Sequence, residues 1–271
     1  MMTKVIVSSA FDQLNSGAFR FLQEASKLGE LHVLLWSDQA IRTLTGREPK
    51  FSQAERAYVI QSVRYVTKLQ SLGANVDPYT PPDLAAIKPD VWVVDEQNAT
   101  PARRAFCAAH GLDYRILTSR DMAGFPEPPP EPPSGRKKVV VTGCYDLFHS
   151  GHVRFFEEVS ELGDLFVVVG HDDNVRLLKG AGHPFFTAAE RRYVAGSIRY
   201  VKQALVSSGL GWMDAEPEIA KIKPDMYVVN EDGDKPEKRE FCRERGIQYI
   251  VLKRLPKEGL PARTSTDLRG F

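Results

Sequence analysis

The sequence predicts an α/β fold built from two tandem domains, each a parallel sheet with helices on both faces. Short apolar segments rich in β-branched residues alternate with stretches of helical spacing, a pattern typical of parallel sheets covered on both sides. The second half of the chain also repeats the first, and a proline-rich segment separates the halves. At 271 residues the chain is long enough for two domains of ordinary size.

The repeat is visible when residue 139 is aligned with residue 5. The shift is 134 residues as far as Gly163 and 135 residues after a single insertion. A register kept over this length with one gap indicates a tandem duplication. The matched segments include Val5–Val7 with Val139–Val141, Leu28–Gly29 with Leu162–Gly163, Ala54–Arg56 with Ala189–Arg191, Arg64–Val66 with Arg199–Val201, Ile87–Asp90 with Ile222–Asp225, and Phe106–Cys107 with Phe241–Cys242.

The same elements are expected in the same order in both copies. In the first copy we expect strands at 5–7, 31–35, 91–94 and near Tyr114, with helices after the first strand, at 55–66 and over Phe106. In the second copy we expect strands at 139–141, 165–169, 226–229 and near Tyr249, with helices at 153–162, 190–201 and over Phe241. Ligands of such sheets bind at the carboxyl ends of the strands.

Residues 121–138 contain six prolines, which exclude a helix or a central strand and favour an extended spacer. We therefore expect a first domain at 1–120, a linker at 121–138 and a second domain at 139–271.

Composition excludes several classes of protein. A net charge of +1 provides no global field for nucleic acid or an anionic membrane. No apolar run approaches the roughly 20 residues that span a bilayer, and signal-peptide features are missing, so a cytoplasmic location is expected. The three cysteines, Cys107, Cys144 and Cys242, have neither CxxC nor CxxH spacing and suggest no disulfide framework or zinc site.

The segment 139–152 carries the most specific local pattern. Three valines lead through a turn into a helical stretch that begins near His149 and His152. Residues three apart project from one face of a helix, and a helix N-terminus attracts anions, so the pattern predicts a phosphate site. Gly143 and Gly151 would let a ligand approach the backbone. The alternative is a capped helix with two surface histidines.

The two copies differ at the residues that such a site would use. The first copy therefore reads as a structural domain and the second as the working one. The replacements, given as second copy and then first, are His149 and Asn15, His152 and Ala18, Gly170 and Trp36, and Lys179 and Thr45. The C-terminal run 263–269 has no counterpart in the first copy.

The basic residues of the second copy suit a triphosphate. If a phosphate oxygen attacks the α-phosphorus, cationic donors and a metal ion stabilise the charge that develops. Arg176 and Arg199 are more simply solvated surface charges, and Arg191 has a counterpart, Arg56, in the silent copy. Asp146 either braces the loop or helps to hold a metal. A zinc site would need a further ligand, and the GxSxG elbow of a hydrolase is missing.

Residues 143–152, together with Lys179–Gly180, Glu190–Arg191, Lys223–Asp225 and Arg263–Thr266, resemble the cytidylyltransferase family of nucleotidyltransferases. The resemblance implies Rossmann-like domains that join CTP or ATP to a phosphorylated small molecule with Mg²⁺ and release pyrophosphate. It implies catalytic roles for His149, His152 and Lys179. The nucleotide-binding residues that it implies are Thr142, Gly143, Cys144, Tyr145, Asp146, Gly151, Gly170, Arg191, Asn230, Arg263, Thr264, Ser265 and Thr266.

The tandem arrangement is similar to that of the ethanolamine-phosphate cytidylyltransferases, so CTP and a phospho-alcohol are the expected substrates. The terminal Thr264–Arg269 run looks closer to adenylyl members of the family, and 174–180 resembles the heptose-phosphate adenylyltransferases. ATP with a sugar phosphate is therefore the alternative. A regulatory protein that binds nucleotide without turnover and a scaffold that binds none are further alternatives.

Two roles remain to be predicted, that of the first copy and that of Trp212. Single-domain family members commonly pair as dimers, so the first domain is expected to replace a second subunit in an intrachain pseudo-dimer, with a larger homo-oligomer left open. Trp212 either stacks on a substrate or packs over the sheet edge. The acidic loop around Asp232 either meets an ammonium group or is solvated.

Overall fold

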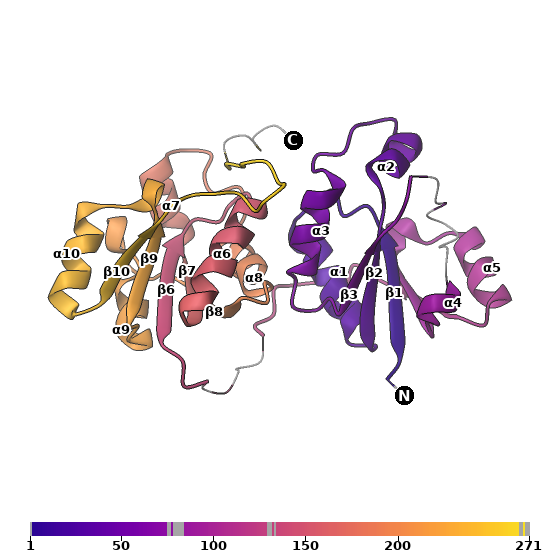
Figure 1. Ribbon diagram of the computed structural model, residues 1–271, viewed down its shortest axis with the longest axis horizontal. Helices are drawn as coiled ribbons and strands as arrows, with labels where there is room; N and C mark the ends of the chain where they lie inside the picture. Colours follow the sequence, from indigo (N-terminus) through magenta and orange to yellow (C-terminus); the bar gives the residue numbers. More distant parts are fainter. Residues whose placement is uncertain are drawn as a thin grey trace. The chain divides into compact units, whose positions relative to one another are not determined.

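The computed structural model of the protein describes residues 2–74, 77, 84–128, 132, 134–265 and 268. The chain divides into two compact units, Met1–Gly124 and Phe125–Phe271, which Figure 1 colours from indigo to magenta and from magenta to yellow. The boundary falls inside the proline-rich segment. Within the described residues, no helix has the length and apolar character needed to cross a membrane.

Unit 1 contains one parallel sheet in its described part, with strand order β3-β2-β1-β4-β5. Its strands are β1 (Lys4–Ser9), β2 (Glu30–Leu35), β3 (Lys68–Ser71), β4 (Val91–Asp95) and β5 (Asp113–Leu117). Its helices are α1 (Ser16–Ser26), α2 (Asp38–Thr45), α3 (Gln53–Gln61), α4 (Leu84–Ile87), η1 (Glu96–Asn98) and α5 (Pro101–Ala109).

Unit 2 repeats this topology with the order β10-β9-β6-β7-β8, again all parallel, which confirms the predicted α/β fold. Its strands are β6 (Lys138–Gly143), β7 (Asp164–Val169), β8 (Val201–Val206), β9 (Met226–Asn230) and β10 (Gln248–Leu252). Its helices are α6 (Ser150–Leu162), α7 (Asp172–Lys179), α8 (Ala188–Gly196), η2 (Gly211–Met213), α9 (Glu216–Ile222), η3 (Glu231–Gly233) and α10 (Pro236–Arg245).

Alternating strand residues send apolar side chains to both faces of the unit 2 sheet. Val140 packs in one core cluster with Ile219 of α9 and Phe241 of α10. Because strand side chains alternate, its fully buried neighbours Val139 and Val141 point to the opposite face, which α6 and α8 cover (Figure 1). Helix α6 therefore lies on one face with its N-terminus at the carboxyl end of β6.

Two predicted helix ends were wrong. The helix expected at 190–201 ends at Gly196, and the one expected at 55–66 ends at Gln61. In unit 2 the amide and hydroxyl of Ser197 both donate to the carbonyl of Tyr193, which closes the helix. Val201 then begins edge strand β8. Apolar residues at 198 and 201 satisfy helical spacing as well as a turn and strand, so the spacing could not separate the two.

Candidate active site

The loop between β6 and α6 is tightly folded around Tyr145. Tyr145 has a backbone φ of 52°, in the left-handed region. Its ring lies against Gly143, where an added Cβ would be 2.8 Å from Tyr145 Cζ and would force the ring to shift. Burial of the Tyr145 side chain raises the pKa of its hydroxyl. Tyr145 therefore stays neutral and shapes the loop by packing against His152 and Phe156.

His149 and His152 meet at the N-terminus of α6. Their rings are stacked with centroids 3.9 Å apart and an interplanar angle of 22°. His149 is the N-cap, and its Nδ1 accepts the amide proton of Gly151 over 3.1 Å. A neutral His149 therefore carries its proton on Nε2. The buried Nδ1 of His152 has no hydrogen-bond partner among the described residues.

Two cationic side chains, Arg254 and Lys179, act electrostatically on His152 of this pair. Burial, followed by His149, Arg254 and Lys179, lowers the pKa of His152 well below its usual value. Burial also raises the pKa of the Cys144 thiol, while Lys179 and Arg191 oppose that rise. The electrostatic influence of Lys179, at the end of α7, thus reaches both the β6–α6 loop and α6. His152 is partly exposed and lies within the electrostatic influence of Lys179 and Arg254, so this site is suited to an anionic ligand.

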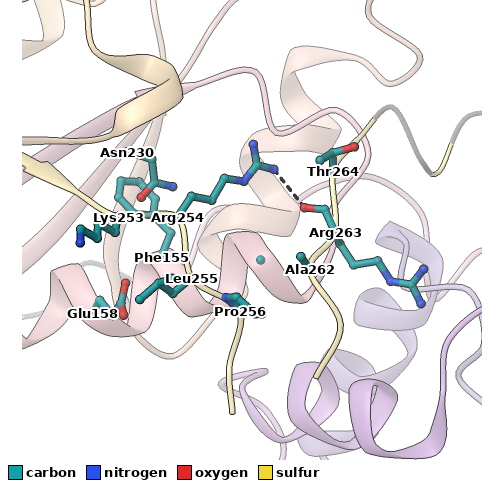
Figure 2. A pocket seen from close by; sticks show the side chains of 11 residues that line it. Phe155, Glu158, Asn230, Lys253, Arg254, Leu255, Pro256, Ala262, Arg263 and Thr264 are labelled. Carbon is teal, nitrogen blue, oxygen red and sulfur yellow. Dashed lines mark hydrogen bonds between the residues drawn. The ribbon is translucent and has the colours of Figure 1, made fainter. Parts of the chain in front are cut away.

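The segment Lys253–Ser265, which we call the C-terminal strap, runs from β10 across the N-terminal end of α6 (Figure 1). Arg254 donates to the carboxylate of Asp232 and, over 3.0 Å, to the carbonyl oxygen of Arg263 (Figure 2). That carbonyl would lie 3.5 Å from a Cβ on Gly151. Farther along α6, Lys257 Nζ is 2.9 Å from a carboxylate oxygen of Glu157.

The strap lines one side of an open cavity of about 150 Å³ beside α6 (Figure 2). Its polar lining comes from the sheet edge, the helix N-terminus and the strap together. The lining residues are Gly151, Phe155, Glu158, Asn230, Lys253, Arg254, Leu255, Pro256, Ala262, Arg263 and Thr264. Of the residues predicted from sequence, the structure thus gathers Gly151, Asn230, Arg263 and Thr264 around one cavity.

Two further predicted residues brace the loop and have counterparts in unit 1. Asp146 accepts the backbone amides of Phe185 and Phe186 at 2.9–3.0 Å, as Asp12 does in unit 1. The guanidinium of Arg191 donates to the carbonyls of Phe186, Cys144 and Gly170 and to Asp172. Arg56 makes the equivalent bonds to a backbone carbonyl and to Asp38. The structure thus favours the bracing interpretation of Asp146.

Thr142 and Gly170 lie at the strand ends beside the loop. The Thr142 hydroxyl is 2.6 Å from the hydroxyl of Tyr227. A Cβ on Gly170 would lie 3.4 Å from Asp214 Oδ2. Trp36 takes the place of Gly170 in unit 1, where its indole nitrogen donates to Ser8 over 2.9 Å and the ring is 8% exposed. The tryptophan is thus part of the unit 1 core.

The strap carries the remaining predicted residues and one that the prediction missed. The Ser265 hydroxyl donates to the Leu147 carbonyl over 3.4 Å, while Thr266 lies outside the described residues. Arg254 was missed. Comparing the copies would have found it, because Lys253–Arg254 after the last strand corresponds to Thr118–Ser119 in unit 1.

Comparison with known proteins finds a family model that matches within unit 2 and relatives that match part of the chain. The cytidylyltransferase-like family model matches residues 140–269. An FAD synthase of Ferroglobus placidus is 38% identical over 125 residues, which cover 45% of this chain and 78% of that protein. The bifunctional protein HldE of Methylococcus capsulatus is 38% identical over 150 residues, which cover 55% of this chain but 28% of that protein.

A solved structure also aligns with part of the chain. It is the lipopolysaccharide core biosynthesis protein of Thermoplasma volcanium, which is 24% identical with a TM-score of 0.39. The alignment covers 46% of this chain and 100% of that protein.

Proposed function

Since this chain is a nucleotidyltransferase that belongs to the cytidylyltransferase-like family, we propose that unit 2 joins a nucleoside triphosphate to a phosphorylated small molecule. An oxygen of the substrate phosphate attacks the α-phosphorus, the bond from the α-phosphorus to the bridging oxygen breaks, and pyrophosphate leaves. The observation that carries this proposal is the stacked His149–His152 pair at the N-terminus of α6. The positive charges of Lys179 and Arg254 contribute to the lowered pKa of His152.

Each part of the site has a role in this reaction. His149 and His152 donate ring N–H groups to phosphate oxygens, and the positive end of the α6 dipole favours the same negative charge. Lys179 and Arg254 neutralise charge that develops on the α-phosphate and pyrophosphate. The strap residues Arg263 and Thr264 offer further donors to the outer phosphates. Because these groups are held in place before the reaction, they need little rearrangement at the transition state.

Mg²⁺ belongs to the proposal as a partner of the nucleotide. Among the described residues, no group of three His, Cys, Asp or Glu side chains could hold a metal ion by itself. Magnesium sites in nucleotide enzymes commonly use one or two carboxylates together with substrate phosphates. The ion would therefore be held largely by the triphosphate, where it would neutralise charge on the phosphate oxygens.

We infer ATP as the first nucleotide to test and CTP as the second. The relatives named FAD synthases favour an adenine nucleotide, because FAD contains an adenylyl group joined to a flavin phosphate. The Thr264–Arg269 run, with its likeness to adenylyl members, points the same way. FMN is accordingly the first candidate for the second substrate, ahead of sugar phosphates and phospho-alcohols.

The experiment is pyrophosphate release with Mg²⁺, ATP or CTP, and a panel of FMN, sugar phosphates and phospho-alcohols. Release with one pair, lost in His152→Ala and kept in His110→Ala, is the expected result. His110 is the matched control because it is an exposed histidine in unit 1 whose ring contacts its helix neighbour Phe106. Nucleotide binding without release from any pair would instead favour a regulatory binding protein.

We propose a structural role for unit 1, as the replacement for a second subunit in an intrachain pseudo-dimer. The support is the contrast between what unit 1 keeps and what it has lost. It keeps the bracing residues Asp12 and Arg56 but has Asn15 and Ala18 in place of the histidines. Equal stability and activity of residues 125–271 alone would rule this role out.

A further inference from the structure

A large aromatic side chain is exposed beside the proposed active site. Trp212 lies on η2, in the loop after β8, and is 48% exposed, and its neighbour Leu210 is 68% exposed. The other two tryptophans, Trp36 and Trp92, are 8% and 0% exposed in unit 1. One face of the Trp212 ring has a cationic neighbour, because Lys235 Nζ lies 4.9 Å from the ring centroid.

A network of polar contacts anchored on the buried Asn174 holds this exposed loop in place. The side-chain amide of Asn174, which is 2% exposed, accepts from the Gly211 amide over 2.7 Å and donates to its carbonyl over 3.1 Å. His171 Nε2 is 2.7 Å from the Gly209 carbonyl oxygen. The Gly209 amide donates to the Asp214 carbonyl over 2.8 Å. Trp212 is therefore carried on a fixed backbone, which lowers the entropy cost of ordering it against a ligand.

The loop borders the strand ends on the face opposite the strap. Its partners are α7 and the beginning of α10, whereas the strap contacts α6 on the other face. Asp214, two residues after Trp212, reaches Gly170 at the end of β7. In-line transfer needs the attacking oxygen and the leaving pyrophosphate on opposite sides of the α-phosphorus. Because we propose that the strap binds the outer phosphates, the Trp212 side remains for the second substrate.

Unit 1 has lost this arrangement together with the histidines. Asn174 corresponds to Ala40, His171 to Ser37 and Trp212 to Asp77. The bracing residues, by contrast, keep their bonds in both units. Like the histidines, the network residues and the tryptophan occur in unit 2 and are replaced in unit 1, whereas the bracing residues occur in both units.

We propose that Trp212 is a stacking platform for a planar aromatic ring carried by the phosphorylated second substrate. The inference rests on the proposed nucleotidyl transfer and names the substrate class, an aromatic ring joined to a phosphate monoester. The indole stacks on the ring, and Lys235 adds a positive charge that suits the anionic substrate.

The test uses the full-length protein and FMN as the probe. We expect Trp212→Ala to raise the KM for FMN about tenfold or more, the size associated with losing one stacked ring. Trp212→Phe keeps a ring and should stay within about threefold of wild type, and the KM for ATP should change less than about twofold in both variants. Leu162→Ala, a partly exposed residue at the far end of α6, serves as the control and should leave both values unchanged.

A binding measurement separates this inference from the proposed function. Flavin fluorescence should be quenched when FMN binds the wild-type protein and much less with Trp212→Ala, whether or not turnover occurs. Unchanged FMN binding in Trp212→Ala, no FMN binding by wild type, or a rise in the KM for ATP alone would each overturn the platform. Pyrophosphate release with a non-aromatic phosphate but no binding of FMN would overturn it while leaving nucleotidyl transfer standing.

Discussion

His152 links the site to the pH dependence of stability. Burial lowers the pKa of His152 in the folded protein, so below about pH 6.5 the unfolded chain binds a proton there that the folded chain does not. Stability therefore rises with pH through this window and falls as the pH drops below it. The contribution of one group is at most about 1.4 kcal/mol per pH unit.

Urea denaturation at pH 5.5 and pH 7.0 tests this expectation. The wild-type protein should lose more of its free energy of unfolding at pH 5.5 than His152→Asn does, because asparagine does not titrate. Equal losses in the two proteins would show that His152 is protonated as readily in the folded state as in the unfolded one.

Gly151 offers a second residue-scale prediction, with its control in the other unit. An added Cβ would lie 2.9 Å from Cε1 of His149, so Gly151→Ala should displace that ring and lower kcat/KM about tenfold or more. At the matching Gly17 the Cβ would meet Asn15 Oδ1 at an ordinary 3.4 Å, so Gly17→Ala should leave activity unchanged. Alanine favours helix over glycine by up to about 1 kcal/mol, and unfolding would not explain the loss. Similar kinetics in both variants would mean that the position of the His149 ring does not matter.

At the scale of elements, the strap depends on Arg254. Its guanidinium joins the η3 loop, through Asp232, to the strap, through the carbonyl of Arg263. We expect Arg254→Met to raise the KM for the nucleoside triphosphate about tenfold or more, because it removes a cation and releases the strap from the loop. Arg245→Met is the matched control, since Arg245 forms an exposed pair with Glu216 at the end of α10 and such pairs contribute little. A KM unchanged by Arg254→Met would exclude the strap from nucleotide binding.

The sequence predicted the elements whose patterns are strong. The central strands are continuous apolar runs that become buried on both faces, such as Val139–Val141, and the duplication placed each of them twice. Edge strand β3 was missed because its four residues, Lys68–Ser71, are mostly exposed and carry no apolar pattern. Helices α2 and α7, which follow β2 and β7, were also missed.

Within the candidate site, contacts between residues close in sequence were easier to predict than contacts between segments far apart in sequence. The pairing of His149 and His152 follows from helical spacing alone, and the structure stacks them. The position of Arg254 follows only when the strap folds back over α6. Asp146 and Arg191 illustrate the opposite difficulty, because bracing and ligand binding use the same residue types, and only their hydrogen bonds show the bracing.

For the whole molecule we expect one nucleotide per chain. Unit 1 has a hollow of about 520 Å³ at the corresponding strand ends, but its charged lining residues are Asp12, Asp95 and Glu96. These carboxylates would repel a triphosphate. Calorimetric titration with a non-hydrolysable triphosphate should give a stoichiometry near one, and Lys179→Met should weaken that single site. A stoichiometry of two would show that unit 1 also binds nucleotide.

Contacts at the boundary between the units predict the residue at which an independently folding unit 2 begins. The buried guanidinium of Arg192 donates to the Phe125 carbonyl over 2.7 Å, and the Phe125 ring lies 5.8 Å from that of Tyr193. On the other side, Arg20 donates to the carbonyls of Asp121 and Met122 within unit 1. A fragment that begins at residue 139 loses this acceptor and the Phe125 ring, and the loss of a hydrogen bond to a charged group costs about 1–3 kcal/mol.

Residues 125–271 should therefore be more stable to urea than residues 139–271. The intermediate fragment 134–271 keeps the contacts of Ser134 with Asp164 and of Arg136 with α6 but lacks Phe125, Glu127 and the Pro132 carbonyl that accepts from Lys202. If 134–271 matched 125–271 in stability, the Arg192 contact would not be what fixes the boundary. If 134–271 is less stable than 125–271, as the Arg192 contact predicts, the start of the proline-rich segment at Phe125 belongs to the fold of unit 2.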